Sequence, residues 1–150
     1  MRYIKLQHFQ QPRNGECLPA CIVMVLAYQG QKIRYRRILR VLKTVKGLGT
    51  PSSNIRHLQQ MGYRVTYQQG SISKLRRHLE QNEPCIVFVQ TGDLPHWDAN
   101  VQHAILVVGI TETDVIIHDP EFAYSPIIVP IGDFDLAWLE HDELYAVIIR

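Results

Sequence analysis

The chain has 150 residues, of which 46% are hydrophobic and 20% are charged. This length and composition predict one globular domain over residues 1–150 and exclude a disordered chain. A net charge of +2 is too small to indicate nucleic acid as the partner. The basic side chains of segment 32–46 are better explained as the solvated face of a helix.

The cysteine count and the hydropathy pattern indicate where the chain works. Three cysteines are an odd number for a chain of this size, which predicts free thiols and a cytoplasmic setting rather than a disulfide framework. No apolar run approaches the roughly 18 residues of a membrane span, and the first residues lack the apolar core of a secretory signal. We therefore expect no membrane segment.

The first half of the chain is predicted to be mainly helical. An extended segment at Tyr3–Leu6 leads through a turn into a helix at Cys17–Tyr28, which Gly30 closes. Apolar residues run nearly all round this helix, so we expect it to be central and buried. The later elements expected here are helices at Arg34–Val45, from Ser52 or Ser53 to Met61, and at Lys74–Gln81, with a strand at Tyr63–Gln68.

The second half is rich in β-branched residues and predicts a sheet. The runs with strand character are Pro84–Gln90, His103–Ile110, Val115–Asp119, Pro126–Val129 and Glu143–Ile149. Helices followed by a sheet are typical of an α+β protein. We expect N-terminal helices packed on a C-terminal, mainly antiparallel sheet.

Cys17 lies where turn-forming residues give way to the apolar helix. The first turn of a helix has unpaired backbone N–H groups and the positive end of the helix dipole, and both favour thiolate over thiol. Cys17 is therefore a candidate nucleophile. Cys21 and Cys85 lie inside apolar runs, where packing is the simpler interpretation.

His103 and Asp119 are predicted to be neighbours. The segment Thr111–Asp114 forms a tight turn between two strands, and antiparallel pairing about that turn places His103 opposite a residue between Asp119 and Phe122. A nucleophilic thiol needs a base, and the base needs a third group that fixes its orientation. Cys17, His103 and Asp119 meet these needs.

A fourth requirement is a donor for the oxyanion of the tetrahedral intermediate. Gln11 lies six residues before Cys17, so the intervening turn can fold its side-chain amide back beside the sulfur. Gln10 is the competing choice.

These residues resemble a known family. The order Gln11, Cys17, His103, Asp119, with a glutamine six residues before a cysteine that opens a buried helix, resembles the papain-like cysteine peptidases. Within them it is most similar to the small type that processes bacteriocin leaders, the double-glycine peptidases. Similar stretches extend over nearly the whole chain, at Leu26–Gly30, Gly49–Ser52, Met61–Tyr63, Leu75–Leu79, Pro84–Val89, His103–Ile110 and His118–Pro120.

The resemblance implies a papain-like fold and cleavage of a peptide or protein substrate without a metal or organic cofactor. Cys17 would be the nucleophile, His103 the base, Asp119 its orienting carboxylate and Gln11 the oxyanion donor. The family usually has Asp-Cys-Gly at the nucleophile, whereas this chain has Leu18 after Cys17. We expect Leu18 to reshape the substrate cleft.

Other interpretations of the same residues stay open. Trp97 precedes His103 in a loop, where it could shield the His–Asp pair, form a substrate wall or serve ordinary packing. Cys17, Cys21 and His103 could ligate zinc, although no fourth ligand is evident. The same site chemistry serves deamidation, transglutamination or another acyl transfer, and the fold could also be a non-catalytic peptide-binding domain.

Overall fold

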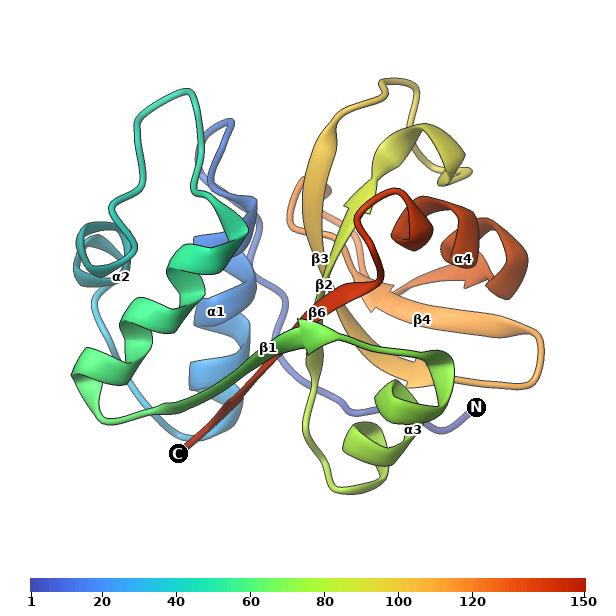
Figure 1. Ribbon diagram of the computed structural model, residues 1–150, viewed down its shortest axis with the longest axis horizontal. Helices are drawn as coiled ribbons and strands as arrows, with labels where there is room; N and C mark the ends of the chain where they lie inside the picture. The colour runs from blue at the N-terminus through green and yellow to red at the C-terminus, as the bar shows by residue number, and fades with distance from the viewer.

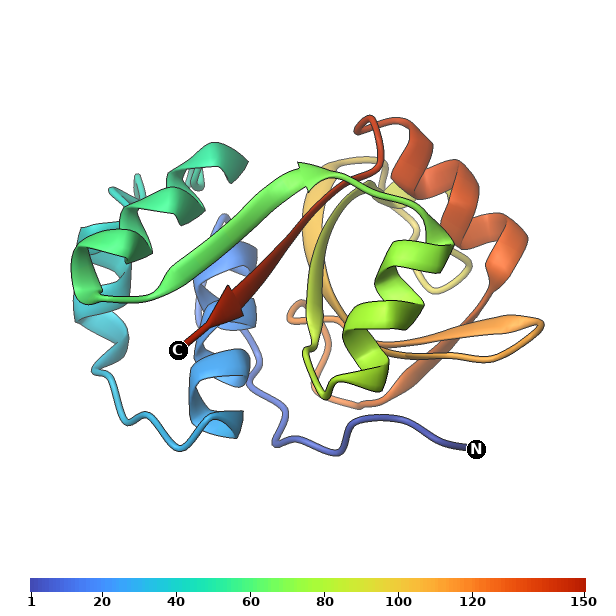
Figure 2. The same ribbon diagram turned by 60° about the horizontal axis from the view of Figure 1, so that its bottom comes forward.

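A computed structural model describes all 150 residues of the chain. The fold is α+β, as expected, with a group of N-terminal helices beside an antiparallel sheet (Figure 1). The N-terminal group contains α1 (Cys17–Tyr28), α2 (Tyr35–Val41) and the 3₁₀ helix η1 (Ser52–Met61). Two further helices, α3 (Ile72–Glu80) and α4 (Ile131–Leu139), lie on the other side of the sheet (Figure 2).

The sheet has six strands, and every neighbouring pair is antiparallel. The strands are β1 (Arg64–Gln69), β2 (Cys85–Gln90), β3 (Gln102–Ile110), β4 (Asp114–His118), β5 (Ile127–Pro130) and β6 (Leu144–Ile149). Their order is β1-β6-β2-β3-β4-β5, so the last strand in the sequence lies between β1 and β2. Figure 2 shows β1 and β6 running side by side across the molecule.

Strand β3 separates two hydrophobic cores. Alternate side chains of a strand point to opposite faces, and Leu106 of β3 packs in one core with α1. Its neighbour Val107 packs in the other core with Trp138 of α4. Because β3 is covered on both faces, its position relative to α1 is determined by packing along most of its length. The strand therefore provides a rigid base for His103 near its start.

The N-terminal segment attaches to the far end of β3. The segment Tyr3–Leu6, expected to be extended, lies outside the strands of the sheet, and its Ile4 N donates to Val108 O at 2.9 Å. A bulge interrupts the β3–β4 register between Val107 and Gly109. A Cβ at Gly109 would lie 2.7 Å from Tyr3 Cβ, so the absence of a side chain allows the two segments to approach.

One helix prediction needs correction. The helix expected over Arg34–Val45 ends at Val41, because Lys43 adopts a positive φ of 55° and Val45 pairs with Gly49 in a β-bridge. The helix expected to end at Met61 is present as the 3₁₀ helix η1. Helix α4 was not predicted at all, although its buried side chains Phe134, Ala137 and Trp138 have helical spacing. Pro130 and Gly132 at its start have low helix propensity, so the local sequence does not indicate a helix there.

Candidate active site

The start of α1 and the start of β3 meet on one side of the sheet. α1 begins at Cys17 and packs against β3, which carries His103. His103 Nε2 lies 2.7 Å from Asp119 Oδ1. Cys17 and His103 line the same pocket, and each shifts the pKa of the other, so the thiol lies close to the imidazole whose Nε2 faces Asp119. The imidazole therefore lies between the thiol and the carboxylate.

Local backbone features position Cys17 and Asp119. The turn before α1 contains Gly15 with a φ of 83°, and a Cβ there would lie 2.9 Å from Gly49 N. The turn between β3 and β4 is closed by Thr111 N donating to Asp114 O at 2.8 Å. The register that follows pairs Leu106 with His118, which leaves Asp119 just beyond β4 and beside the start of β3.

The environment of His103 favours its charged form. Burial disfavours an imidazolium, but hydrogen bonds and charge interactions with Asp119 and Cys17 outweigh it and raise the pKa of His103 to about 9. For Cys17, burial likewise opposes the charged form. The hydrogen bond and positive charge of His103, with backbone contributions from Ala104 and Leu18, prevail and lower the pKa of the thiol. A thiolate–imidazolium pair is the arrangement that these shifts favour.

The carboxylate of Asp119 is fully buried and receives four donors. Oδ1 accepts from His103 Nε2 at 2.7 Å and from Glu121 N at 3.1 Å. Oδ2 accepts from His96 Nε2 and Trp97 Nε1, each at 2.8 Å. Burial raises the pKa of a carboxyl group, but these hydrogen bonds and the charge of His103 hold the pKa of Asp119 well below its usual range.

Gln11 and Gln10 differ in what their side chains contact. Gln11 N donates to Pro120 O at 2.7 Å, which ties this segment to the residue after Asp119. Gln11 Nε2 donates to Arg13 O at 3.0 Å within its own turn, and the structure gives it no bond to Cys17. Its Oε1 is buried without a partner. Gln10 is exposed, and its Nε2 donates to Glu121 O.

A pocket of about 190 Å³ opens beside Cys17 and His103. Leu18 is 2% exposed and lines it together with Phe88 and Leu144. The pocket is also lined by Leu48, which is 86% exposed, and by residues 49–52. The pocket is therefore lined by both apolar and polar residues next to the sulfur.

Trp97 does not line this pocket. Its ring packs edge-on against the ring of His103, with centroids 4.8 Å apart, and against Phe122. Together with its bond to Asp119, this contact covers the His103–Asp119 pair. Of the two roles in catalysis considered for Trp97, these contacts fit shielding of the pair.

Sequence reasoning missed His96. The only signal was its position beside Trp97, because nothing in the sequence specifies how the loop 91–101 folds back over Asp119. The zinc arrangement gains no geometric support: Cys21 Sγ faces Ala104 O at 3.7 Å, and the structure gathers no group of three or more potential metal ligands.

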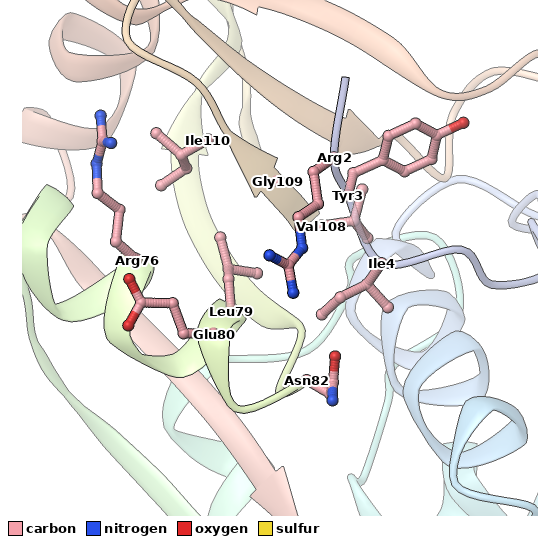
Figure 3. A pocket seen from close by; sticks show the side chains of 10 residues that line it. All are labelled: Arg2, Tyr3, Ile4, Arg76, Leu79, Glu80, Asn82, Val108, Gly109 and Ile110. Carbon is pink, nitrogen blue, oxygen red and sulfur yellow. The ribbon is translucent and has the colours of Figure 1, made fainter.

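A second pocket, of about 290 Å³, lies at the other end of β3 (Figure 3). Gly109 and the N-terminal Arg2 and Tyr3 form one side of it, and Arg76 and Leu79 of α3 form the other. Although larger, this pocket is separated from His103 by most of the length of β3 and holds no thiol or imidazole.

The helices, the antiparallel sheet and the thiol next to an imidazole together define the papain-like fold of cysteine peptidases. The model of the peptidase C39 family matches residues 5–141, so the chain belongs to the peptidase C39 family.

No curated protein matches the chain. No helix is long and apolar enough to cross a membrane.

Solved structures share this fold at low sequence identity. A C39-like peptidase from Bacillus anthracis superposes with a TM-score of 0.79 and 15% identity, over 100% of this chain and 98% of that one. The peptidase domain of Streptococcus ComA, a bifunctional transporter, superposes with a TM-score of 0.76 and 20% identity, over 97% of this chain and 98% of that one. A double-glycine-motif protease from a PCAT transporter, solved in complex with the leader peptide, superposes with a TM-score of 0.71 and 22% identity, over 98% of this chain and 93% of that one.

Proposed function

We propose that the protein is a cysteine peptidase that cleaves a peptide bond through a thioester. The observation that carries this proposal is the imidazole of His103 between the thiol of Cys17 and the carboxylate of Asp119. The lowered pKa of Cys17 and the raised pKa of His103 favour a thiolate nucleophile and a charged acid.

In the first step, the Cys17 sulfur attacks the carbonyl carbon of the peptide bond. The resulting oxyanion accepts hydrogen bonds from the backbone N–H of Cys17 and from the side chain of Gln11, whose Nε2 keeps one N–H beyond the bond to Arg13. As the carbon–nitrogen bond breaks, His103 gives its proton to the leaving amine. The acyl group remains on Cys17 as a thioester.

In the second step, neutral His103 takes a proton from water, and the hydroxide formed attacks the thioester. The carbon–sulfur bond breaks, the acid is released, and Cys17 and His103 return to the thiolate–imidazolium pair. Asp119 holds the imidazole in place through both steps. Neither of these two reaction steps requires a metal ion or an organic cofactor.

The substrate we propose is a peptide or a peptide segment of a protein. The related PCAT protease binds a leader peptide, which supports an extended peptide in the pocket beside Cys17. Leu18 contributes to the lining of that pocket, and we infer that it shapes which side chains fit there. The proposed nucleophile acts only as a free thiol, which the cytoplasm would preserve.

Alkylation tests the nucleophile without knowledge of the substrate. We expect iodoacetamide at neutral pH to label Cys17 at least about tenfold faster than Cys21 and Cys85, because one unit of thiol pKa changes the thiolate fraction about tenfold. The His103→Ala variant should lose that advantage. Equal labelling of all three cysteines, or fast labelling that persists in His103→Ala, would refute the proposed pair.

Peptide cleavage tests the reaction. The wild-type protein and its Cys17→Ala variant would each be incubated with a proteome-derived peptide library and the products identified by mass spectrometry. We expect new peptide termini with the wild type alone. Conversion of glutamine side chains without new termini would instead favour deamidation or transglutamination. Fast, His103-dependent labelling without any reaction of the library would count against a peptidase of broad specificity.

A further inference from the structure

The second carboxylate oxygen of Asp119 has a hydrogen-bonding environment of its own. Whereas Oδ1 serves His103, Oδ2 accepts from His96 Nε2 and Trp97 Nε1. A carboxylate offers about four acceptor positions, and with Glu121 N all of them are used. The orientation of the carboxylate toward His103 is therefore determined by three groups besides His103 itself.

The ring of His96 is held in one tautomer. Nε2 faces a carboxylate oxygen, so it carries the proton. Nδ1 is buried and has no partner, so a proton there would lack an acceptor. The side chain is only 10% exposed, and its ring packs edge-on against Phe122. His96 is therefore a donor aimed at Asp119, with its other nitrogen buried and without a partner.

We propose that His96 is a positioning residue for the reaction proposed above, holding Asp119 so that Oδ1 points at His103. The inference rests on that proposed function, because the effect of His96 reaches Cys17 only through Asp119 and His103. His96 does not line the pocket beside Cys17, so it makes no contact with substrate there.

Trp97 alone does not supply the same constraint. Without His96, Oδ2 keeps a single donor, and the carboxylate is held by three donors instead of four. Hydrogen bonds to a charged group are stronger than those between neutral groups. Loss of the His96 bond therefore allows orientations of Asp119 in which its bond to His103 is lengthened.

Variants at position 96 separate positioning from packing. His96→Phe keeps an aromatic ring but removes the donor, and His96→Gln places an amide N–H near the position of Nε2. We expect the rate of Cys17 alkylation at neutral pH to fall at least about fivefold in His96→Phe, because this variant has no donor to Asp119. In His96→Gln, which keeps a donor, the rate should stay within about twofold of wild type. His57→Phe, which removes a ring bonded to Val41 O outside the site, should have no effect.

An Asp119→Asn background shows whether the effect passes through Asp119. If it does, His96→Phe causes no further loss there, whereas a general packing role gives the same loss in both backgrounds. Additive losses, or an unchanged rate in a folded His96→Phe protein, overturn the inference and leave the proposed function standing. Wild-type Cys17 that labels no faster than Cys21 refutes both.

A spectroscopic measurement covers the case in which His96→Phe does not fold. Nitrogen-15 NMR of histidines in the wild-type protein should show His96 with its proton on Nε2 at neutral pH, and its signal should shift in Asp119→Asn. A His96 ring with its proton on Nδ1, or one that is insensitive to Asp119→Asn, contradicts the inference without any variant at position 96.

Discussion

Cys17 and Cys21 lie one turn apart on α1, yet their thiol pKa values shift in opposite directions. Burial raises the pKa of Cys21 well above its ordinary value, and the proximity of Cys17 and Asp119 adds to that effect. Cys17 is also buried, but His103 reverses the shift. The side chain of His103 therefore distinguishes the two thiols, because Cys21 has no such partner.

The pH dependence of peptide cleavage and of alkylation should differ. The pKa of His103 is about 9, so above that pH the imidazole loses the proton that the leaving amine needs. We expect kcat/KM for cleavage to fall as pH rises through about 9. Iodoacetamide needs only the thiolate, so labelling of Cys17 should persist above that pH. Parallel loss of both rates would contradict His103 as the acid.

Asp119→Asn should slow catalysis and change how stability depends on pH. The variant keeps the size of the side chain but loses its charge, and we expect kcat/KM to fall roughly 10²- to 10⁴-fold. The folded-state pKa of Asp119 lies below its unfolded value, so its stabilisation is present above about pH 4 and is lost as pH falls.

Urea unfolding at pH 7 and pH 3 measures this second effect. The wild type should lose more free energy of unfolding than Asp119→Asn between these two values, since only the wild type has at position 119 a carboxylate that takes up a proton on unfolding in acid. A variant that loses as much stability in acid as the wild type would show that other groups dominate acid unfolding.

Gln11→Ala and Gln10→Ala form a matched pair. Both remove an amide from the turn before Cys17, but the side chain of Gln10 is bonded to Glu121 O. We expect Gln11→Ala to lower kcat by about 10²- to 10³-fold, the usual effect of losing an oxyanion donor. Gln10→Ala should change kcat by less than about threefold, since it removes no such donor. The reverse ranking would transfer the oxyanion role to Gln10.

Leu18→Ala should affect both stability and the pocket beside Cys17. Leu18 is almost fully buried, and truncation of such a side chain costs about 2 to 5 kcal/mol of unfolding free energy. The enlarged pocket should accept bulkier residues next to the cleaved bond, which peptide-library cleavage would detect. An unchanged cleavage pattern in a folded variant would show that Leu18 acts only in the core.

Gly109→Ala should destabilise the fold without altering the thiol. Its new Cβ would lie 2.7 Å from Tyr3 Cβ and 3.1 Å from Arg2 O, so the N-terminal segment must move away from β3. Overpacking of this kind costs about 1 to 3 kcal/mol. Because Gly109 lies far along β3 from His103, Cys17 should alkylate at the wild-type rate. A slowed alkylation would reveal coupling along the strand.

Local signals explain which parts of the fold could be predicted. The bounds of α1 agree with the prediction because a turn precedes Cys17 and Gly30 follows the helix. Strand β3 is a continuous apolar run, and its predicted turn with β4 brings His103 next to Asp119. These features depend on residues that are close in the sequence.

The features that could not be predicted depend on contacts between distant segments. The bond from His96 to Asp119 requires the path of a loop that no local pattern specifies. Gln11 is anchored by its backbone to Pro120, a residue more than a hundred positions away. The early end of α2 depends on the pairing of Val45 with Gly49, which competes with helix continuation.

The place of β6 between β1 and β2 affects how the protein can be made. A ribosome releases β1 long before β6, so β1 has no sheet partner for most of synthesis. An unpaired strand edge is a template for intermolecular association. Nascent chains stalled before Leu144 should therefore aggregate or recruit chaperones, and the sheet that supports His103 reaches its full width only after the last strand emerges.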